Sequence, residues 1–435
     1  MKRLLKTIFL FLCLGALLAW PVFAVTEDAE DAPDGLVQLE NGLYYYEDGI
    51  PFCGGLKEVI DSTGDPVYYY FQADGRAYHE GVLKLTDEDG KAVYYYFQSN
   101  CKAYTSGYKG TNTYAEANAD CVVTKSSDQT ARRYYFQSNG QAYTKGYLQF
   151  THTNGKSYNF FFQSNGTALT DSWQTVDGGH YYFGSNGQGL KGWQTISGSK
   201  YYFDSDSKAL TGKQTVGNYL CYFDDNGALT RSINKNGKMV AVTYDDGPSQ
   251  YTGTILDVLE QNDAVATFFV VGSRVSDYAS TAKREISLGC EIGNHTYDHV
   301  NLTKKSTSEI KSQVSKTNDA VKKAAGVTPV ILRPPGGNFN NTVKSTVGMP
   351  LIYWSIDTRD WEHRNAQTTI NNVLNNVRDG DIILMHDLYS STADAAKTII
   401  PTLINRGYQL VTVSELAECR GGMKNGIVYY NFRNT

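Results

Sequence analysis

Hydrophobic and polar positions follow one repeating order in the first half of the chain. From about Gly42 to Thr230, a short aromatic run is followed by a polar turn and a small hydrophobic segment. Aromatic residues favour strands, and Asn-Gly or Asp-Gly pairs supply the positive φ of a tight turn, so each copy predicts a β-hairpin. One hairpin cannot bury its own aromatic face, so the pattern predicts a solenoid of stacked hairpins. The aromatic runs lie at Tyr68–Phe71, Tyr94–Phe97, Tyr134–Phe136, Phe160–Phe162, Tyr181–Phe183, Tyr201–Phe203 and Cys221–Phe223.

The pattern changes near Asn234, where strand-like and helix-like segments begin to alternate. Alternation of this kind predicts parallel βα units, and the number of strands favours a distorted (β/α) barrel. In such folds the chemistry lies at the C-terminal ends of the strands. Strands are predicted at 238–242, 266–271, 330–332, 351–356, 382–385 and 409–413, and helices at 252–260, 280–288, 308–325, 368–377 and 393–405. The fold class is therefore multidomain, with a β-hairpin repeat solenoid before an α/β domain.

The first residues predict export. Lys2 and Arg3 precede an apolar stretch, and Val22-Phe23-Ala24 offers the small residues that a signal peptidase requires. A membrane anchor is the alternative, because the apolar stretch is only slightly shorter than the roughly 20 residues needed to span a bilayer. An acidic run follows it, and we expect cleavage and no membrane span afterwards. The predicted divisions are a signal peptide at 1–24, an acidic linker at 25–41, repeats at 42–232, the α/β domain at 238–420 and a tail at 421–435.

Composition adds little to this picture. The net charge of −5 gives no basic surface of the kind that binds nucleic acid or an anionic membrane. Six cysteines remain after the predicted cleavage, and their spacing shows neither a CxxC metal motif nor a pairing.

Two pairs of residues in the α/β domain suit a metal site. Asp245 and Asp246 directly follow the first predicted strand, and Gly-Pro after them forces a turn. His295 and His299 are four residues apart, a spacing that on a helical turn brings two side chains to about 5–6 Å from each other. Either pair alone is often a solvated turn or an ordinary surface feature. With one aspartate as third ligand, two imidazoles suit Zn²⁺ and leave a position open for water.

Three further groups lie where a predicted strand ends. Arg333 begins the segment Arg-Pro-Pro-Gly-Gly, which contains Gly336; Asp360 and Trp361 follow the next strand; and His386 follows Leu384 in the strand after that. A plain turn, a surface ion pair and a half-buried histidine would explain each of them singly. Their joint position at strand ends favours a single site.

These five groups, in this order, resemble the polysaccharide deacetylases of carbohydrate esterase family 4, also called the NodB homology domain. The resemblance covers about 238–418. It implies that Asp246, His295 and His299 hold a divalent metal, with zinc favoured and cobalt or another divalent ion as alternatives. It also implies that Asp245 is the general base and His386 the general acid.

The same resemblance assigns supporting roles. The backbone N–H of Gly336 would meet the oxyanion, and Arg333 and Asp360 would orient the base and the acid. Many relatives carry an aromatic residue where Gly336 stands, which implies a more open groove here. Tyr244, Trp361 and Leu384 would line the substrate pocket, and the tail would pack on the domain.

The repeats resemble the choline- or glucan-binding repeats of surface proteins from Gram-positive bacteria. In that family a Trp of one hairpin and Tyr residues of the next form cages for the wall ligand. Trp173 and Trp193 occupy the matching place, and a cation–π cage near Trp173, Tyr182 and Trp193 is expected. The alternative is that the aromatic residues only fill the solenoid core.

These resemblances together imply a secreted, wall-associated hydrolase of a Gram-positive bacterium. The favoured activity is release of acetate from N-acetylglucosamine in peptidoglycan, with the repeats bound to a wall polymer. One alternative is a deacetylase of another N-acetylated or O-acetylated polysaccharide, such as a chitin-like chain, an exopolysaccharide or acetyl xylan. Another is an adhesin or scaffold with a vestigial enzyme domain.

Overall fold

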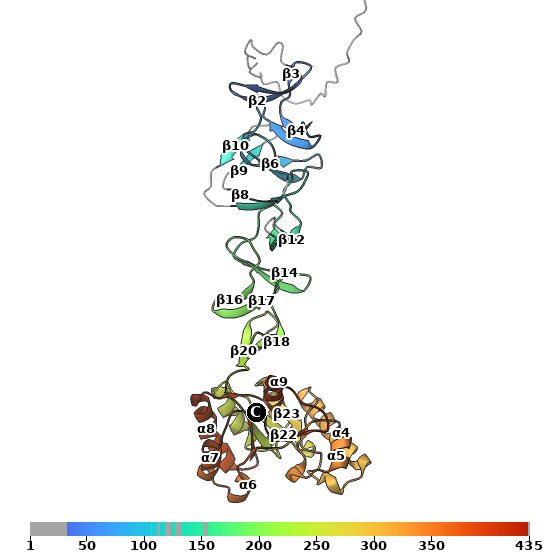
Figure 1. The fold of residues 1–435 in the computed structure, drawn as a ribbon, viewed down its shortest axis with the longest axis vertical. Helices are drawn as coiled ribbons and strands as arrows, with labels where there is room; N and C mark the ends of the chain where they lie inside the picture. Colours follow the sequence, from blue (N-terminus) through green and yellow to red (C-terminus); the bar gives the residue numbers. More distant parts are fainter. Residues whose placement is uncertain are drawn as a thin grey trace, which may run out of the picture. The chain divides into compact units, whose positions relative to one another are not determined.

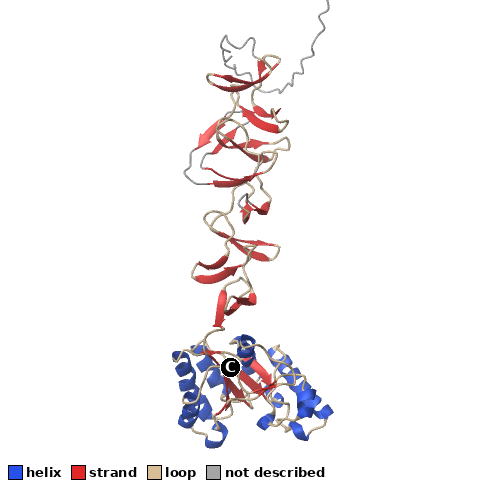
Figure 2. Cartoon of the chain, viewed as in Figure 1, coloured by secondary structure: helices blue, strands red, loops and turns tan. Residues whose placement is uncertain are grey.

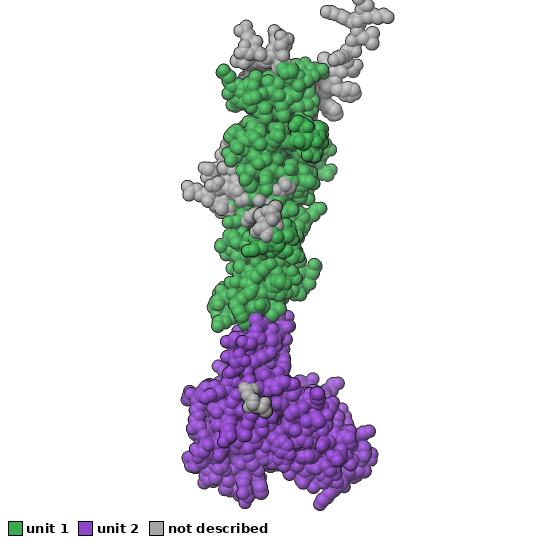
Figure 3. Space-filling model, in the orientation of Figure 1, with its two compact units in different colours: residues 1–210 green, residues 211–435 purple. Residues whose placement is uncertain are grey.

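The computed structural model describes residues 33–105, 107–111, 114–117, 123–126, 132–151 and 155–433. The predicted signal peptide and residues 25–32 of the acidic linker lie outside the described residues. The chain divides into two compact units, Met1–Leu210 and Thr211–Thr435 (Figure 3). The multidomain organisation is thereby confirmed, while the exact boundaries given above remain predictions.

The described part of unit 1 consists of short strands joined by turns (Figures 1 and 2). Apart from one parallel pair, β6 with β9, these strands pair antiparallel. The strands are β1 (Gly35–Leu39), β2 (Gly42–Glu47), β3 (Ile50–Pro51), β4 (Gly55–Ile60), β5 (Pro66–Phe71), β6 (Gly81–Thr86), β7 (Ala92–Phe97), β8 (Gly107–Thr111), β9 (Tyr114–Ala117), β10 (Val123–Ser126), β11 (Arg132–Phe136), β12 (Gly146–Thr151), β13 (Ser157–Phe162), β14 (Ser172–Val176), β15 (Gly179–Phe183), β16 (Gly192–Ile196) and β17 (Ser199–Phe203).

Each repeat is tied to the one before it by a recurring backbone contact. The last aromatic residue of a hairpin is almost fully buried and forms a bridge with a small residue six positions later, as Phe162 does with Ala168. The N–H of Ala168 donates to Arg133 in the preceding hairpin, and Ala209 donates in the same way to His180. The aromatic pattern in the sequence therefore marks the side chains that fill the core between neighbouring hairpins.

The Asn-Gly turns do not lie where the hairpin prediction placed them. Asn165-Gly166 follows the second strand of its hairpin, and the strands β14 and β15 are joined instead by Asp177-Gly178. Both residues of that loop have positive φ, 47° and 72°, as a tight turn between twisted antiparallel strands requires.

Unit 2 begins with a three-stranded antiparallel sheet and continues as alternating strands and helices (Figure 1). No helix among the described residues is long and apolar enough to cross a membrane. Its strands are β18 (Gly212–Val216), β19 (Tyr219–Phe223), β20 (Leu229–Asn234), β21 (Met239–Asp245), β22 (Thr267–Val270), β23 (Glu291–Asn294), β24 (Leu351–Ile352), β25 (Ile356–Asp357), β26 (Asp381–His386), β27 (Gln409–Leu410) and β28 (Val428–Tyr429). Its helices are α1 (Thr252–Gln261), α2 (Gly272–Val275), α3 (Ala279–Ser287), α4 (Thr307–Ala325), α5 (Asn341–Thr346), α6 (Asp360–His363), α7 (Ala366–Leu374), α8 (Ser390–Asn405) and α9 (Val413–Cys419), with 3₁₀ turns at Leu302–Lys304 and Pro335–Gly337.

A parallel sheet in the order β23-β22-β21-β26-β25 forms the centre of unit 2, and β27 also pairs with β21. Beyond β23, Leu332 makes single parallel bridges to Asn294 and to Leu351. β28 pairs parallel with β24, so the C-terminal tail is part of the same structure. The parallel arrangement is as predicted, whereas closure into a barrel remains a prediction.

Side chains of β21 alternate between two cores. Val240, Val242 and Tyr244 pack with the apolar faces of α1 and α8, and Met239 and Ala241 belong to a second cluster on the other face. Because successive residues of a strand point to opposite faces, Thr243 and Asp245 lie on the side opposite Tyr244. The functional groups described below are on that side.

Three of the predicted strands differ from the structure. Residues 330–332 form only two isolated bridges, both at Leu332, and the strand expected at 351–356 is divided into β24 and β25. The strand expected at 409–413 ends at Leu410, because Thr412 and Glu415 form a reciprocal capping box that begins α9. The Thr412 and Glu415 pair is present in the sequence, but the hydrophobic residues beside it led to the prediction of a strand.

The hairpin of β19 and β20 shares the core of unit 2. Leu220 and Ile233 are almost fully buried in the cluster that contains Met239 and Ala241. The hydroxyl of Tyr222 donates to Glu415 at 2.6 Å, and the guanidinium of Arg231 pairs with the same carboxylate. This hairpin therefore has a repeat-like sequence but packs as part of the α/β unit.

We expect Leu220→Ala to lower the free energy of unfolding of unit 2 by about 2–5 kcal/mol, the usual cost of a cavity in a packed core. All described helices lie in unit 2, so the helical circular dichroism signal follows its unfolding. Tyr219→Ala is the matched control, because Tyr219 is 43% exposed. Equal midpoints for the two variants would show that the hairpin is not part of this core.

Candidate metal centre and active site

Asp246, His295 and His299 come together in the folded chain. One ligand atom from each lies within 4.8 Å of the other two. Oδ1 of Asp246 is 3.3 Å from Nε2 of His295 and 2.9 Å from Nε2 of His299. His295 is 2% exposed and His299 about half exposed, so the group opens to solvent on one side.

The histidines reach this position from an irregular loop and not from a helical turn, which corrects the reason given for their spacing. Thr296 and His299 have positive φ values of 64° and 54°, which no α-helix contains. Backbone conformations of this kind in residues other than glycine are uncommon and cluster at functional sites. Asp246, at the end of β21, also has a positive φ, of 74°.

Gln313 of α4 holds this loop, and sequence reasoning did not identify it. Its Oε1 accepts from the backbone N–H groups of Tyr297 and Asp298 at 2.9 Å, and its Nε2 donates to the carboxylate of Asp298. Asn294 adds a fourth bond, from the N–H of Thr296 to its Oδ1. The two histidines are thus placed by amide side chains and by turns of the backbone.

The donor set has the form of a metal site. Oδ1 of Asp246 is buried and has no hydrogen-bond partner of acceptable geometry, although two imidazole nitrogens lie close to it. Nδ1 of His295 lies 2.7 Å from the carbonyl of Arg333, so with the proton on Nδ1, Nε2 offers its lone pair to the group. The hydrogen bond with the carboxylate of Asp246 raises the pKa of His299. A metal cation would take the place of the proton on this imidazole.

Asp245 lies beside this group and is bound to a buried arginine. Nη1 of Arg333 donates to Oδ1 of Asp245 at 2.6 Å and to the hydroxyl of Thr243 at 2.7 Å. Oδ2 of Asp245 is 3.8 Å from Nε2 of His295. Arg333 is fully buried and also donates to the carbonyls of Ile352 and Tyr353. One oxygen of Asp245 is therefore fixed, and the other faces the candidate metal ligands.

His386, at the end of β26, is bound to Asp360. Its Nδ1 lies 2.8 Å from Oδ1 of Asp360, and its backbone N–H donates to the other carboxylate oxygen. Thr392 donates to that carboxylate as well, so Asp360 is fully held. Burial by itself lowers the pKa of His386, but the hydrogen bond and charge of Asp360, with Asp245 and Asp246 nearby, outweigh it and raise the pKa to about 9. His386 is therefore a cation at neutral pH.

The expected pocket residues divide into two groups. Leu384 lies two residues before His386 on the same face of β26, where it pairs with Thr243. Trp361 follows Asp360 and is 46% exposed. Gly336 is exposed, with a φ of 62°. Tyr244 is fully buried in the core behind the sheet and stacks on Phe268, so the expectation that it lines the pocket was wrong. Strand alternation turns its ring away from Asp245.

The tryptophans of the repeats are partly exposed in unit 1. Trp173 lies across its hairpin from Tyr182, with ring centroids 5.3 Å apart, and Trp193 has the same relation to Tyr202. Trp173 also contacts Tyr201 of the next hairpin at 4.9 Å. Tyr201 was not singled out from the sequence, although its position one repeat ahead is the signal that identifies it.

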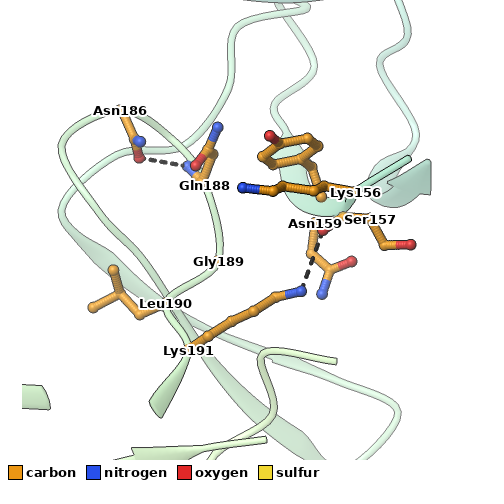
Figure 4. A pocket seen from close by; sticks show the side chains of 9 residues that line it. Lys156, Ser157, Asn159, Asn186, Gln188, Gly189, Leu190 and Lys191 are labelled. Atoms are coloured by element: carbon orange, nitrogen blue, oxygen red, sulfur yellow. Dashed lines mark hydrogen bonds between the residues drawn. The ribbon is translucent and has the colours of Figure 1, made fainter. Parts of the chain in front are cut away.

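Unit 1 also contains a hollow of about 470 Å³ (Figure 4). Lys191 donates from its ammonium to the carbonyl of Ser157, and the side chain of Asn186 accepts from the N–H of Gln188. Its lining consists of Lys156, Ser157, Tyr158, Asn159, Asn186, Gln188, Gly189, Leu190 and Lys191. Tyr158 and Leu190 contribute apolar surface beside the lysine and amide groups, and the lining does not include the aromatic cluster at Trp173.

Comparison with known proteins identifies both parts of the chain. Residues 232–349 match the family described as polysaccharide deacetylase, and residues 169–210 match the choline-binding repeat. A peptidoglycan-N-acetylglucosamine deacetylase of Bacillus cereus is 37% identical over 199 residues, which are 44% of this chain and 93% of that protein. The peptidoglycan-N-acetylmuramic acid deacetylase PdaC of Bacillus subtilis is 43% identical over 190 residues, 43% of this chain and 41% of that protein. The peptidoglycan-N-acetylglucosamine deacetylase PgdA of Listeria monocytogenes is 43% identical over 183 residues, 42% of this chain and 39% of that protein.

The chain belongs to the polysaccharide deacetylase family, whose deacetylases are metal-dependent enzymes. The resemblance seen in the sequence is thereby confirmed for both parts of the chain. The chain spans about two fifths of the length of the first two curated relatives, PdaC and PgdA.

Proposed function

We propose that this protein hydrolyses the N-acetyl group of N-acetylglucosamine residues in peptidoglycan and releases acetate. The observation that supports it best is the joint placement of Asp246, His295 and His299 beside Asp245. The relatives named for peptidoglycan support the substrate class. Their names differ in the sugar, glucosamine or muramic acid, and the experiment below separates the two.

Asp246, His295 and His299 would hold a divalent cation, with zinc as the best match to two nitrogens and one oxygen. When bound, the cation polarises the acetamide carbonyl and lowers the pKa of a water molecule. The unpartnered Oδ1 of Asp246 and the Nε2 of His295 are the atoms that fit this role.

Asp245 would be the general base. Its Oδ2 faces the candidate metal ligands, while Arg333 holds the other oxygen, so the free oxygen would be the one that takes a proton from the attacking water. Arg333 acts on Asp245 as a positioning residue. The backbone N–H of Gly336 would donate to the oxyanion that forms.

His386 would be the general acid. Asp360 holds its Nδ1, which leaves Nε2 to give a proton to the sugar nitrogen as acetate departs. Leu384 and Trp361 would enclose the acetyl methyl. The high pKa of His386 keeps the proton available at neutral pH.

The repeats would hold the enzyme on the wall as a stacked solenoid. The backbone links between successive hairpins support stacking, and Trp173 with Tyr182 and Tyr201 offers an aromatic site for a wall ligand. We infer that the protein is secreted after removal of a signal peptide and is associated with the wall of a Gram-positive bacterium. We also infer that the sheet of unit 2 is a distorted barrel, because Leu332 links β23 to β24, and the segment from β24 to β25 leads back to β26.

Purified peptidoglycan, incubated with the protein and then digested to muropeptides, tests the proposed activity. Mass spectrometry should show loss of one acetyl group per modified sugar, and fragmentation assigns the loss to glucosamine. Loss from muramic acid would correct the sugar. Acetate release from a chitin-like oligomer or acetyl xylan, with none from peptidoglycan, would establish the alternative substrate class, and no release from any of these would favour a scaffold.

Activity should fall on the alkaline side of the pH profile as His386 loses its proton. Asp360 raises the pKa of His386, so Asp360→Asn should move the alkaline limb to lower pH. A bound cation adds positive charge near His386, so the alkaline limbs of the wild-type protein and of Asp360→Asn both lie below pH 9. The limb of the variant still lies at the lower pH of the two. The measurement is kcat/KM against pH for both proteins, and an alkaline limb at the same pH in both would contradict His386 as the acid.

A further inference from the structure

An aromatic cluster that no step above uses lies next to the candidate active site. The ring of Tyr353 stacks on Trp354 with a centroid distance of 4.0 Å and contacts Tyr430 at 4.7 Å. Phe339 meets Tyr353 edge-on at 6.1 Å. Tyr430 is 45% exposed although it packs against the ring of Tyr353.

The tail brings Tyr430 to this place. β28 pairs with β24, and the N–H of Tyr353 donates to the carbonyl of Tyr429, so the next residue, Tyr430, lies beside the ring of Tyr353. The bridge between Asp381 and Asn431 fixes the chain on the other side of Tyr430. Both flanks of the tyrosine are therefore held by backbone hydrogen bonds, while its ring stays exposed.

Two contacts connect the cluster to the catalytic groups. The guanidinium of Arg333 donates to Asp245 at 2.6 Å and to the carbonyl of Tyr353 at 2.9 Å. A Cβ added to Gly337 would lie 2.5 Å from the hydroxyl of Tyr353, so that hydroxyl occupies the space above the glycine next to Gly336. Burial raises the pKa of Tyr353, with smaller contributions from Tyr430 and from Asp357 at the end of β25. The cluster therefore borders the same strand ends as the site.

We propose that Tyr353 and Tyr430 form an aromatic platform for a sugar ring of the polysaccharide next to the ring that is deacetylated. The proposal rests on the function proposed above. Flat aromatic faces that are partly exposed and rigidly held pack well against the apolar face of a pyranose, and they lose little conformational entropy on binding. The hydroxyl of Tyr353 fills the space above Gly337, so the ring lies directly against the backbone next to Gly336.

The test compares long and short substrates. In Tyr430→Ala, the ratio of kcat/KM for a hexamer of N-acetylglucosamine to that for a dimer should fall about three- to tenfold, the usual effect of losing one aromatic contact. Tyr430→Phe keeps the ring and should keep the ratio. Tyr219→Ala, which removes a tyrosine of similar exposure elsewhere in unit 2, is the control.

A ratio that stays unchanged in Tyr430→Ala, whether both values of kcat/KM are kept or fall equally, overturns the platform. The peptidoglycan digest described above decides the proposed function separately, and if the wild-type protein releases acetate from neither oligomer, the platform is tested by binding. Titration calorimetry of the hexamer into Asp245→Asn, with and without Tyr430→Ala, decides that case. Weaker binding in the double variant supports the platform, and equal dissociation constants overturn it.

Discussion

Asp245→Asn should reduce acetate release by about 100- to 10,000-fold, the contribution expected of a general base. The amide cannot take the proton of the attacking water, but its oxygen can still accept from Nη1 of Arg333. The variant should therefore keep its binding of metal. It should also unfold at a lower temperature, because the buried charge of Arg333 loses its counter-ion.

The comparison needs a carboxylate of the same type outside the site. Asp394 on α8 is exposed and pairs with Lys397, so Asp394→Asn makes the same chemical change with little effect on stability or turnover. Turnover is measured by acetate release, and folding by circular dichroism at the assay temperature. If folded Asp245→Asn retained wild-type turnover, another residue would have to be the base.

The sequence predicted which candidate site residues lie together, because strand ends meet at one edge of a parallel sheet. Asp245, Asp246 and His386 needed only the correct placement of β21 and β26. The spacing of the histidines gave a correct proximity for an incorrect reason, because a helix was assumed where the loop has positive φ values. The local sequence pattern identifies the residues of the candidate site. The backbone conformation that positions them depends on contacts from distant residues such as Gln313.

The residues that were wrongly placed or missed depend on the face of the strand and on distance along the chain. Tyr244 lies next to Asp245 in sequence but on the other face of β21, where alternation alone would have placed it. Tyr430 reaches Tyr353 only because β28 pairs with β24, and no periodicity signals a two-residue parallel pair. Choosing residues by adjacency to a motif therefore fails within strands, where the immediate neighbours of a residue point to the opposite face.

Removal of the metal should abolish acetate release, and His299→Ala should prevent its recovery when metal is returned. His299 is about half exposed and contributes Nε2 to the group with Asp246, so its loss removes a ligand without opening the core. A readout independent of activity is thermal stability, since a ligand that binds only the folded state stabilises it. Zinc at about 100 times its dissociation constant should stabilise the wild-type protein by about 2.7 kcal/mol.

His79→Ala is the matched control, because His79 is an exposed histidine in unit 1 with no part in the metal group. That variant should regain full acetate release with added zinc and show the wild-type increase in melting temperature. His299→Ala should regain no acetate release and show no increase in melting temperature with added zinc. Its melting temperature without metal should stay near that of the metal-free wild type. A metal-free wild-type protein that still turned over substrate, or equal thermal stabilisation of His299→Ala by zinc, would remove the basis for assigning Asp246, His295 and His299 as ligands.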